Sequence, residues 1–398
     1  MNKFDASSAK LSRHSIGSQK PLIVLYVAAV FLYWISLYLY VPTLPLYAKN
    51  KTDNLALVGV ILSMYGLWQA IIRLPLGITA DWLGWRKPFI IIGFALAGLG
   101  AYLMGAADGA NELILGRSLT GLAAGTWVPL VVVFSSFFPP SEAVRASALL
   151  TLSGSAGRML ATSLTGWLNE QWGYQLAFLL AAAAATLSVI IISPIHEERH
   201  PPRRPSARGI SQLIVRRDVL FPSLLSAVSQ YANWGVTFGF LAILARQLGA
   251  SDIVQSVLVA MNLGLVTIGN LAATAIVRRI GAKRLVYASF LLMALGIGVA
   301  ALAFSLPMVF LVQFCMGLSQ GIGYPMLMGM SIEHVAEAER TTAMGLHQAV
   351  YAIGMFSGPW LSGILADTIG LQPMFGVTMF ACLVLGLLGA GKLTSVEK

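Results

Sequence analysis

The chain has 398 residues, of which 57% are hydrophobic and only 11% are charged, with a formal net charge of +10. An ordinary soluble domain carries about 25% charged residues, and a soluble chain of this size could not cover so much apolar surface. The composition therefore excludes a soluble enzyme and a disordered chain, and it predicts a protein that has the lipid bilayer as its solvent.

Apolar stretches long enough to cross a bilayer recur along the whole chain. A spanning helix needs about 20 mostly apolar residues. The first stretch follows a basic arm and is too long for the apolar core of a signal peptide, so we interpret it as a spanning helix. The twelve predicted stretches are 22–47, 56–80, 88–107, 112–138, 145–169, 175–194, 219–247, 252–277, 285–304, 308–332, 341–366 and 374–392.

A segment rich in proline and arginine, 195–218, separates the first six stretches from the last six. Its prolines disfavour a regular helix interior, and its charges favour water. We therefore expect an all-α membrane protein with twelve transmembrane helices in two bundles. The predicted parts are an N-terminal arm at 1–21, a first bundle at 22–194, a basic linker at 195–218, a second bundle at 219–392 and a tail at 393–398.

The basic residues are unevenly distributed between the two sides of this arrangement. Only Lys49, Lys51 and Arg246 of the 26 lysines and arginines fall in the turns opposite the termini. Because positive charge marks the cytoplasmic side, we expect a multi-pass protein of the plasma membrane with both termini in the cytoplasm. The same distribution explains the positive charge without a nucleic-acid partner.

The two halves of the sequence resemble each other at an offset of 196 or 197 residues. Two parallel repeats imply two similar bundles that can rock around a site near the membrane midplane. The matching positions include Gly121, Gly125 and Pro129 with Gly317, Gly321 and Pro325, and Gly157, Gly166 and Gly173 with Gly354, Gly363 and Gly370.

The turn after the second stretch carries Gly77, Asp81, Gly84, Arg86 and Lys87 in the pattern G-x-x-x-D-x-x-G-x-[RK]-[RK]. This pattern resembles the signature loop of the major facilitator superfamily, and the run from Arg117 to Gly125 is similar to that family's second motif. The resemblance covers essentially the whole chain and is nearest to the drug and metabolite exporters. It implies a secondary transporter, and not an enzyme, in which Asp81 acts as a gating latch in one conformation.

Three arginines lie within apolar stretches: Arg73, Arg117 and Arg158. An arginine at the centre of a spanning helix costs about 2.5–3.5 kcal/mol on insertion scales, and no carboxylate lies comparably deep in the first half. Since a guanidinium can bind a carboxylate or phosphate with two hydrogen bonds, we predict a cavity that attracts anions. Each arginine also has an alternative explanation that involves no anion. Arg117 belongs to a motif that the family shows with many cargos, the side chain of Arg73 could extend to the loop near Asp81, and Arg158 could pack on carbonyl groups at helix ends.

Polar and aromatic side chains also interrupt the apolar helices. Such a stripe should face protein or a wet cavity and not lipid, and helices one and seven line the cavity in the family that the chain resembles. The substrate-binding candidates besides the arginines are Tyr33, Trp34, Gln230, Asn233, Trp234 and Tyr351. We consider Asp81 and His347 as proton-coupling groups, although such a histidine more often joins two helices by a hydrogen bond.

These features predict a transporter that moves a small organic solute by alternating access, as a proton-driven exporter or antiporter of metabolites or drugs. Two alternatives stay open: a permease for anionic organic solutes that uses the buried arginines, and a flippase for lipid head groups. No metal, nucleophile or phosphate-loop pattern stands out, so we expect no metal and no cofactor. The expected partners are the solute, H⁺ and the bilayer, around a monomer.

Overall fold

The structure is a computed structural model that describes residues 3–139, 142–197, 216–336 and 340–393, all of them in helices or short connections. The first spanning segment is broken in its second half. α1 (Lys3–Tyr38) ends before the short η1 (Val41–Thr43) and α2 (Leu44–Lys51). Pro42 and Pro45 lack the N–H group that a continuous helix requires, which explains the break. At its other end α1 begins at Lys3, so it includes most of residues 1–21, the predicted N-terminal arm.

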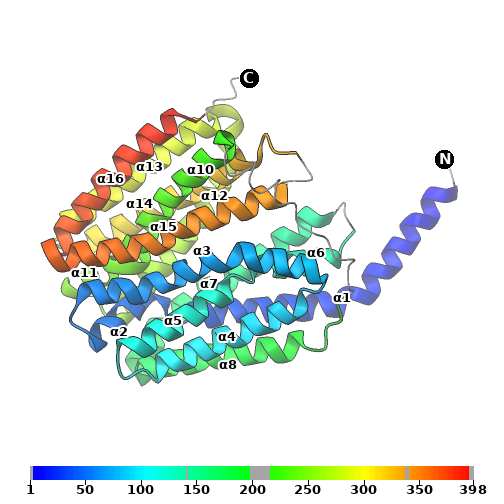
Figure 1. The fold of residues 1–398 in the computed structure, drawn as a ribbon, viewed down its shortest axis with the longest axis horizontal. Coiled ribbons are helices and arrows are strands. Elements are labelled where there is room, and N and C mark those ends of the chain that lie inside the picture. Colours follow the sequence, from blue (N-terminus) through cyan, green and yellow to red (C-terminus); the bar gives the residue numbers. More distant parts are fainter. Residues whose placement is uncertain (1–2, 140–141, 198–215, 337–339, 394–398) are drawn as a thin grey trace.

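The rest of the first bundle alternates in direction through short turns (Figure 1). The fourth predicted stretch consists of two helices, α5 and α6, which meet at Gly125 and Thr126. The elements are α3 (Leu55–Leu83), α4 (Lys87–Gly105), α5 (Ala110–Ala124), α6 (Trp127–Ser136), α7 (Ala143–Trp172) and α8 (Tyr174–Ile192).

The second bundle repeats this arrangement. Its first segment is also irregular, because a wider π-helical turn, η3 (Asn233–Phe240), separates α10 (Arg217–Ala232) from α11 (Leu241–Gln247) and contains the non-helical Gly239. The remaining helices are α12 (Asp252–Ile280), α13 (Ala282–Ala301), α14 (Leu306–Ile332), α15 (Arg340–Ile369) and α16 (Leu371–Gly391).

Each of the twelve predicted stretches corresponds to one helix or one broken helix. Ten segments of the described chain are long and apolar enough to cross a membrane. The other two are α7, which carries Arg145, Arg158 and Glu170, and the broken segment of α10, η3 and α11. The structure thus confirms the predicted fold class. The predicted linker lies mostly outside the described residues.

The two bundles meet along a seam where α3 packs on α15 (Figure 1) and α7 packs on α12. Glycines allow backbones to touch there, since a Cβ on Gly59 would lie 2.4 Å from the Pro359 carbonyl oxygen and a Cβ on Gly66 would lie 2.4 Å from the Met355 carbonyl carbon. Nearer the other ends of the same helices, a Cβ on Gly77 or Gly345 would meet nothing within 4 Å. The bundles are therefore in close contact along one half of the seam.

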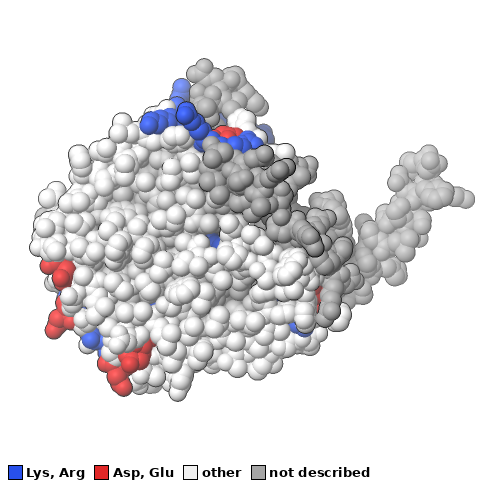
Figure 2. Space-filling view, viewed as in Figure 1, with Lys and Arg blue, Asp and Glu red and all other residues white. Residues whose placement is uncertain are grey.

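We call the end of the molecule that carries the termini the terminal face, and the opposite end, with the turns after Lys51, Gln247 and Ile369, the distal face. Close contact at Gly59 and Gly66 lies in the distal half of α3. Figure 2 shows acidic side chains gathered at one edge of the molecule and basic side chains near the C-terminal end. The two faces thus differ in charge as the sequence predicts.

Candidate functional site

Arg117 is the most enclosed of the three arginines. It projects from α5, is 2% exposed, and its guanidinium lies 4.2 Å from the ring centre of Tyr65 on α3. The Tyr65 ring stacks on Trp234 of the second bundle at 5.1 Å, and Trp234 also lies 6.0 Å from the guanidinium. A cation over an aromatic face is stabilised by the ring quadrupole. Arg117, Tyr65 and Trp234 therefore form a cationic and aromatic stack across the seam.

Arg73 joins the bundles closer to the terminal face. Its guanidinium donates to the hydroxyl oxygen of Tyr351 at 2.5 Å and to Gln348 at 3.4 Å, both on α15, and also to Gln69 one turn earlier on α3. It lies 5.1 Å from the Tyr351 ring centre as well. The structure thus places Arg73 and Tyr351, two predicted site residues from different bundles, in direct contact.

Arg158 lies on α7 over the aromatic side chains of α1. Its guanidinium is 4.8 Å from the Trp34 ring centre and 5.7 Å from that of Tyr38, and it donates to Ser155 at 3.1 Å. Tyr324 of the second bundle is within electrostatic range of both Arg158 and Arg73. Arg158 therefore belongs to the same region of the seam as Arg73.

None of the three arginines forms an ion pair with a carboxylate in the part of the chain that the structure describes. Instead, each is placed against at least one aromatic ring. Several guanidinium nitrogens keep unused hydrogen-bonding capacity among the described residues: Nε of all three, and Nη1 of Arg117. Because a buried unsatisfied donor costs about 1–3 kcal/mol, these atoms are suited to binding an acceptor group of a solute.

Other buried polar atoms near the seam have no protein partner among the described residues. One of them is the side-chain oxygen of Asn233, the residue before Trp234. Thr237 on η3 and the Trp34 indole N–H are further cases. Donors and acceptors that lack partners within an apolar protein mark a place where a polar ligand or water completes the hydrogen bonding. Trp34, Asn233 and Trp234 thus lie at this region of the seam.

His347 is completely buried in the second bundle. Its Nδ1 lies 3.1 Å from the Ser223 hydroxyl of α10, and its ring contacts those of Tyr324 and Tyr351. His347 therefore joins α15 to α10 by a hydrogen bond between the two helices. Its Nε2 has no hydrogen-bond partner among the described residues. Through Tyr351, the histidine is also one side chain away from Arg73.

Tyr33 packs within the first bundle, and its ring centre lies 5.7 Å from that of Trp34. The Tyr33 hydroxyl donates to the Ala123 carbonyl at 2.6 Å, and its ring stacks on Phe94 at 4.6 Å. Both partners belong to the first bundle, so these contacts support packing there, and a role of Tyr33 in the site stays a prediction. Gln230 is 9% exposed on α10, one residue after Ser229, which accepts from Gln320.

The predicted gating loop turns at Gly84, whose left-handed backbone (φ 62°) ends α3. The side chain of Asp81 lies outside the described residues, so the proposed latch stays a prediction. The structure adds a partner that the sequence analysis missed: the Glu197 carboxylate accepts from the backbone N–H groups of Arg86 at 3.0 Å and Lys87 at 2.6 Å. Glu197 is 9% exposed, so the start of the linker is packed against the loop.

Tyr65 and Gln69 are the other residues that the sequence analysis missed. A signal was available, because the repeat aligns Tyr65 with Asn262 and Arg117 with Gln313. Asn262 donates to the Gln313 side chain at 2.9 Å, so the second bundle contains the neutral counterpart of the contact between Tyr65 and Arg117. The repeat offset that connects the arginines to their counterparts also identifies their partners.

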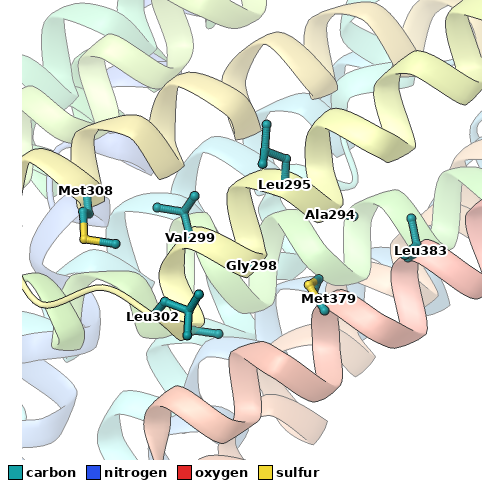
Figure 3. A pocket seen from close by; sticks show the side chains of 9 residues that line it. Ala294, Leu295, Gly298, Val299, Leu302, Met308, Met379 and Leu383 are labelled. Carbon is teal, nitrogen blue, oxygen red and sulfur yellow. The ribbon is translucent and has the colours of Figure 1, made fainter.

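Two surface pockets lie away from this site. A groove of about 540 Å³ between α13, α14 and α16 is lined only by apolar side chains such as Leu295, Val299 and Met379 (Figure 3). It offers no polar group to orient a solute. A second pocket, of about 420 Å³, lies at the distal end of the seam. It is lined by Lys49, Arg246 and Asp53, and the first two are among the three basic residues in the turns opposite the termini.

Two similar helical bundles with a polar, aromatic seam between them are an architecture typical of secondary transporters. A family profile described as the Major Facilitator Superfamily matches residues 26–229 and 223–397. The chain belongs to the major facilitator superfamily. It is a multi-pass membrane protein that transports a small molecule as a secondary transporter, and it is not an enzyme, as the sequence predicts.

Similar proteins agree with this assignment. The multidrug resistance protein MdtH of Aeromonas salmonicida is 28% identical over 344 residues, which are 84% of this chain and 83% of that protein. The quinolone resistance protein NorA of Staphylococcus aureus is 26% identical over 219 residues, 54% of this chain and 52% of NorA. The crystal structure of the nucleoside transporter NupG has a TM-score of 0.77 at 17% identity and covers 94% of this chain and 100% of that one; this likeness concerns the fold.

Proposed function

We propose that this protein exports small amphipathic organic compounds, drugs or metabolites, that combine a flat ring system with an acidic group. The observation that carries the proposal is the set of three arginines, each against aromatic rings and none paired with a described carboxylate. Aromatic faces suit a flat ring, and free guanidinium nitrogens suit a carboxylate. The names of MdtH and NorA, a multidrug and a quinolone resistance protein, support export.

The site would combine residues of both bundles. Arg73 and Tyr351 would hold the acidic group, while Tyr65, Trp234 and Trp34 would contact the ring system. Because Arg73 and Tyr351 belong to different bundles, a solute that competes for the guanidinium would weaken one of the contacts that joins them. Binding would thus be coupled to the relative position of the bundles, as alternating access requires.

We further propose that the terminal face is cytoplasmic, since it carries most of the lysines and arginines, and that protons drive export. The closed distal half of the seam then makes the described structure inward-facing. Every aspartate and glutamate in the part of the chain that the structure describes lies at or near a helix end or in a connection between helices. His347 and the acidic group of the cargo are therefore our candidates to carry the proton.

Everted membrane vesicles with an imposed pH gradient test this function. We expect uptake of a fluorescent aromatic carboxylate, weaker uptake of its neutral amide, and loss of the difference in Arg73→Gln. Tyr102→Phe, an exposed position on α4, serves as a matched control and should transport like the parent. Uptake of aromatic cations alone would leave the acidic-group proposal without support while the export proposal stands. Uptake of labelled phospholipid alone would favour the flippase alternative.

A further inference from the structure

Two acidic side chains reach across the seam at the distal face. Glu170, in the last turn of α7, accepts a hydrogen bond from the backbone N–H of Ile253 at 3.0 Å, in the first turn of α12. Asp367, in the last turn of α15, accepts from the N–H of Leu55 at 3.0 Å, the first residue of α3. Each bundle therefore places one carboxylate on the beginning of a helix of the other bundle.

The hydrogen-bonding needs of a helix start explain why both contacts form. The first four N–H groups of a helix have no partner within it. Asn54 supplies one for Leu57 of α3, and Ser251 supplies one for Val254 of α12. These caps from within the bundle leave the N–H groups of Leu55 and Ile253 to the carboxylates, which are also attracted by the positive end of the helix dipole.

A glycine one turn before each acid lets the partner helix approach. A Cβ on Gly166 would lie 2.1 Å from the Asp252 carbonyl oxygen, and a Cβ on Gly363 would lie 2.8 Å from the Leu55 carbonyl oxygen. The two ends thus share the pattern Gly-x-x-x-acid: Gly166 with Glu170, and Gly363 with Asp367. Both members of the second pair follow the first pair by the repeat offset of 197 residues. The contacts are therefore two symmetry-related copies of one device.

We propose that Glu170 and Asp367 are positioning residues that hold the distal gate closed, and that both contacts must break before the transporter opens to the distal side. Donor and acceptor belong to different bundles in each case, so any rotation that opens this face separates them. Opening at the terminal face does not require either bond to break. The pair therefore biases the transporter towards the state that is open to the terminal face, whatever cargo it carries.

The labelling rate of a seam cysteine measures the open fraction. The hydroxyl of Ser256 accepts from the Gly166 N–H within the closed seam and is 1% exposed. In a Ser256→Cys background, a membrane-impermeant maleimide applied to intact cells reacts in proportion to the distally open fraction, however small that fraction is. Cys315 and Cys382 are buried, and the parent chain without the added cysteine gives the background rate.

We expect Glu170→Ala and Asp367→Ala each to raise the labelling rate about 2- to 30-fold, the range implied by loss of one helix N-cap. The double variant should show about the product of the two increases, because the contacts are separate. Glu112→Ala is the matched control: this acid lies near the same face but caps its own helix through the Gly109 N–H, so the rate should not change. Glu170→Gln and Asp367→Asn, which keep the shape, should give smaller increases and cover the case in which an alanine variant folds poorly.

A double variant with the parent's labelling rate would overturn the proposal, and so would an equal increase in Glu112→Ala. The same labelling in everted vesicles shows which face admits the reagent. If the reagent reacts only there, our assignment of the cytoplasmic face is wrong while the comparison of variants still tests the gate. No cargo is added in either assay, and the parent and the variants are compared in the same cells, so the comparison does not depend on the proposed substrate.

Discussion

The guanidinium of Arg117 lies over the Tyr65 ring at 4.2 Å, and this contact takes the place of a carboxylate partner for a buried charge. A desolvated cation over an aromatic face gains up to about 2 kcal/mol. We therefore expect Tyr65→Leu to lower the stability of the protein by about 1–2 kcal/mol and to reduce transport. Thermal unfolding in detergent and vesicle uptake measure the two effects. Tyr65→Phe keeps the ring and should stay close to the parent; an equal loss in Tyr65→Phe would assign the effect to the hydroxyl.

Tyr351 provides Arg73 with both a hydroxyl oxygen and a ring. Tyr351→Phe removes the hydroxyl alone, and a hydrogen bond to a charged group contributes about 1.5–3 kcal/mol. We expect this variant to be expressed normally but to transport less, because one of the bonds that joins the bundles is lost. Tyr324→Phe is the control, because it removes the hydroxyl of a neighbouring tyrosine whose ring centre lies 5.9 Å from that of Tyr351. The measurement is the initial rate of uptake, and equal rates for the two variants would count against the role of the hydroxyl.

Backbone contact at Gly66 should make the closed seam sensitive to a single methyl group. A Cβ there would lie 2.4 Å from backbone atoms of Met355 and Phe356, whereas a Cβ on Gly264 of α12 would meet nothing within 4 Å. Overpacking of this kind costs about 1–3 kcal/mol. We expect Gly66→Ala to raise the labelling rate of a cysteine at position 256, and Gly264→Ala to leave it unchanged. A Gly66→Ala variant that labels like the parent would show that α3 and α15 adjust without separating.

The sequence predicts the twelve helices because apolar length alone determines which segments cross a bilayer, and it predicts two bundles because the repeat offset is nearly constant. It does not predict the direction of each side chain. Tyr33 is an example: its hydroxyl turns inward to the carbonyl of Ala123 at the end of α5, which also accepts from the N–H of Thr126. A polar residue on an apolar helix can satisfy such a carbonyl in its own bundle as well as line a cavity.

Contacts across the seam are harder to predict, since they depend on how the bundles are placed. Glu170 and Asp367 match at the same offset as Gly166 and Gly363, yet a search for charges deep in the membrane passes over residues at helix ends. What the repeat does provide is the pairing of positions, and Tyr65 could have been found from its counterpart Asn262. The helix ends carry information about the gate that hydropathy does not report.

Glu197 fixes the start of the linker to the beginning of α4. Its carboxylate accepts from two backbone N–H groups, so Glu197→Ala leaves both without this partner. We expect a loss of about 0.5–2 kcal/mol, as for other helix caps, seen as a lower melting temperature. Glu142→Ala is the control at the same face, because Arg145, its ion-pair partner, is largely exposed and such a pair contributes little. Equal melting temperatures for the two variants would show that the cap is not needed for stability.

The pH response of the distal gate should follow from Glu170. The N–H of Ile253 holds the pKa of this carboxyl below its usual value, with further help from the Ser251 side chain and the charge of Arg246; Asp252 offers a backbone N–H on the same side. A group whose pKa is lowered in the closed state favours closure when it is ionised, and this contribution is lost as the pH falls through the lowered pKa. Ordinary glutamates titrate near pH ~4.3.

We therefore expect labelling of Ser256→Cys to stay constant between about pH 7 and 5 and to rise only in stronger acid, when rates are normalised to those of Asp108→Cys at an exposed position. Glu170→Gln should remove this part of the rise. A transition near neutral pH that persists in Glu170→Gln would instead show that a group other than Glu170 controls the gate in that range. Since Glu170 stays ionised at neutral pH, protons cannot open the gate through it there, and any proton coupling has to act through another group.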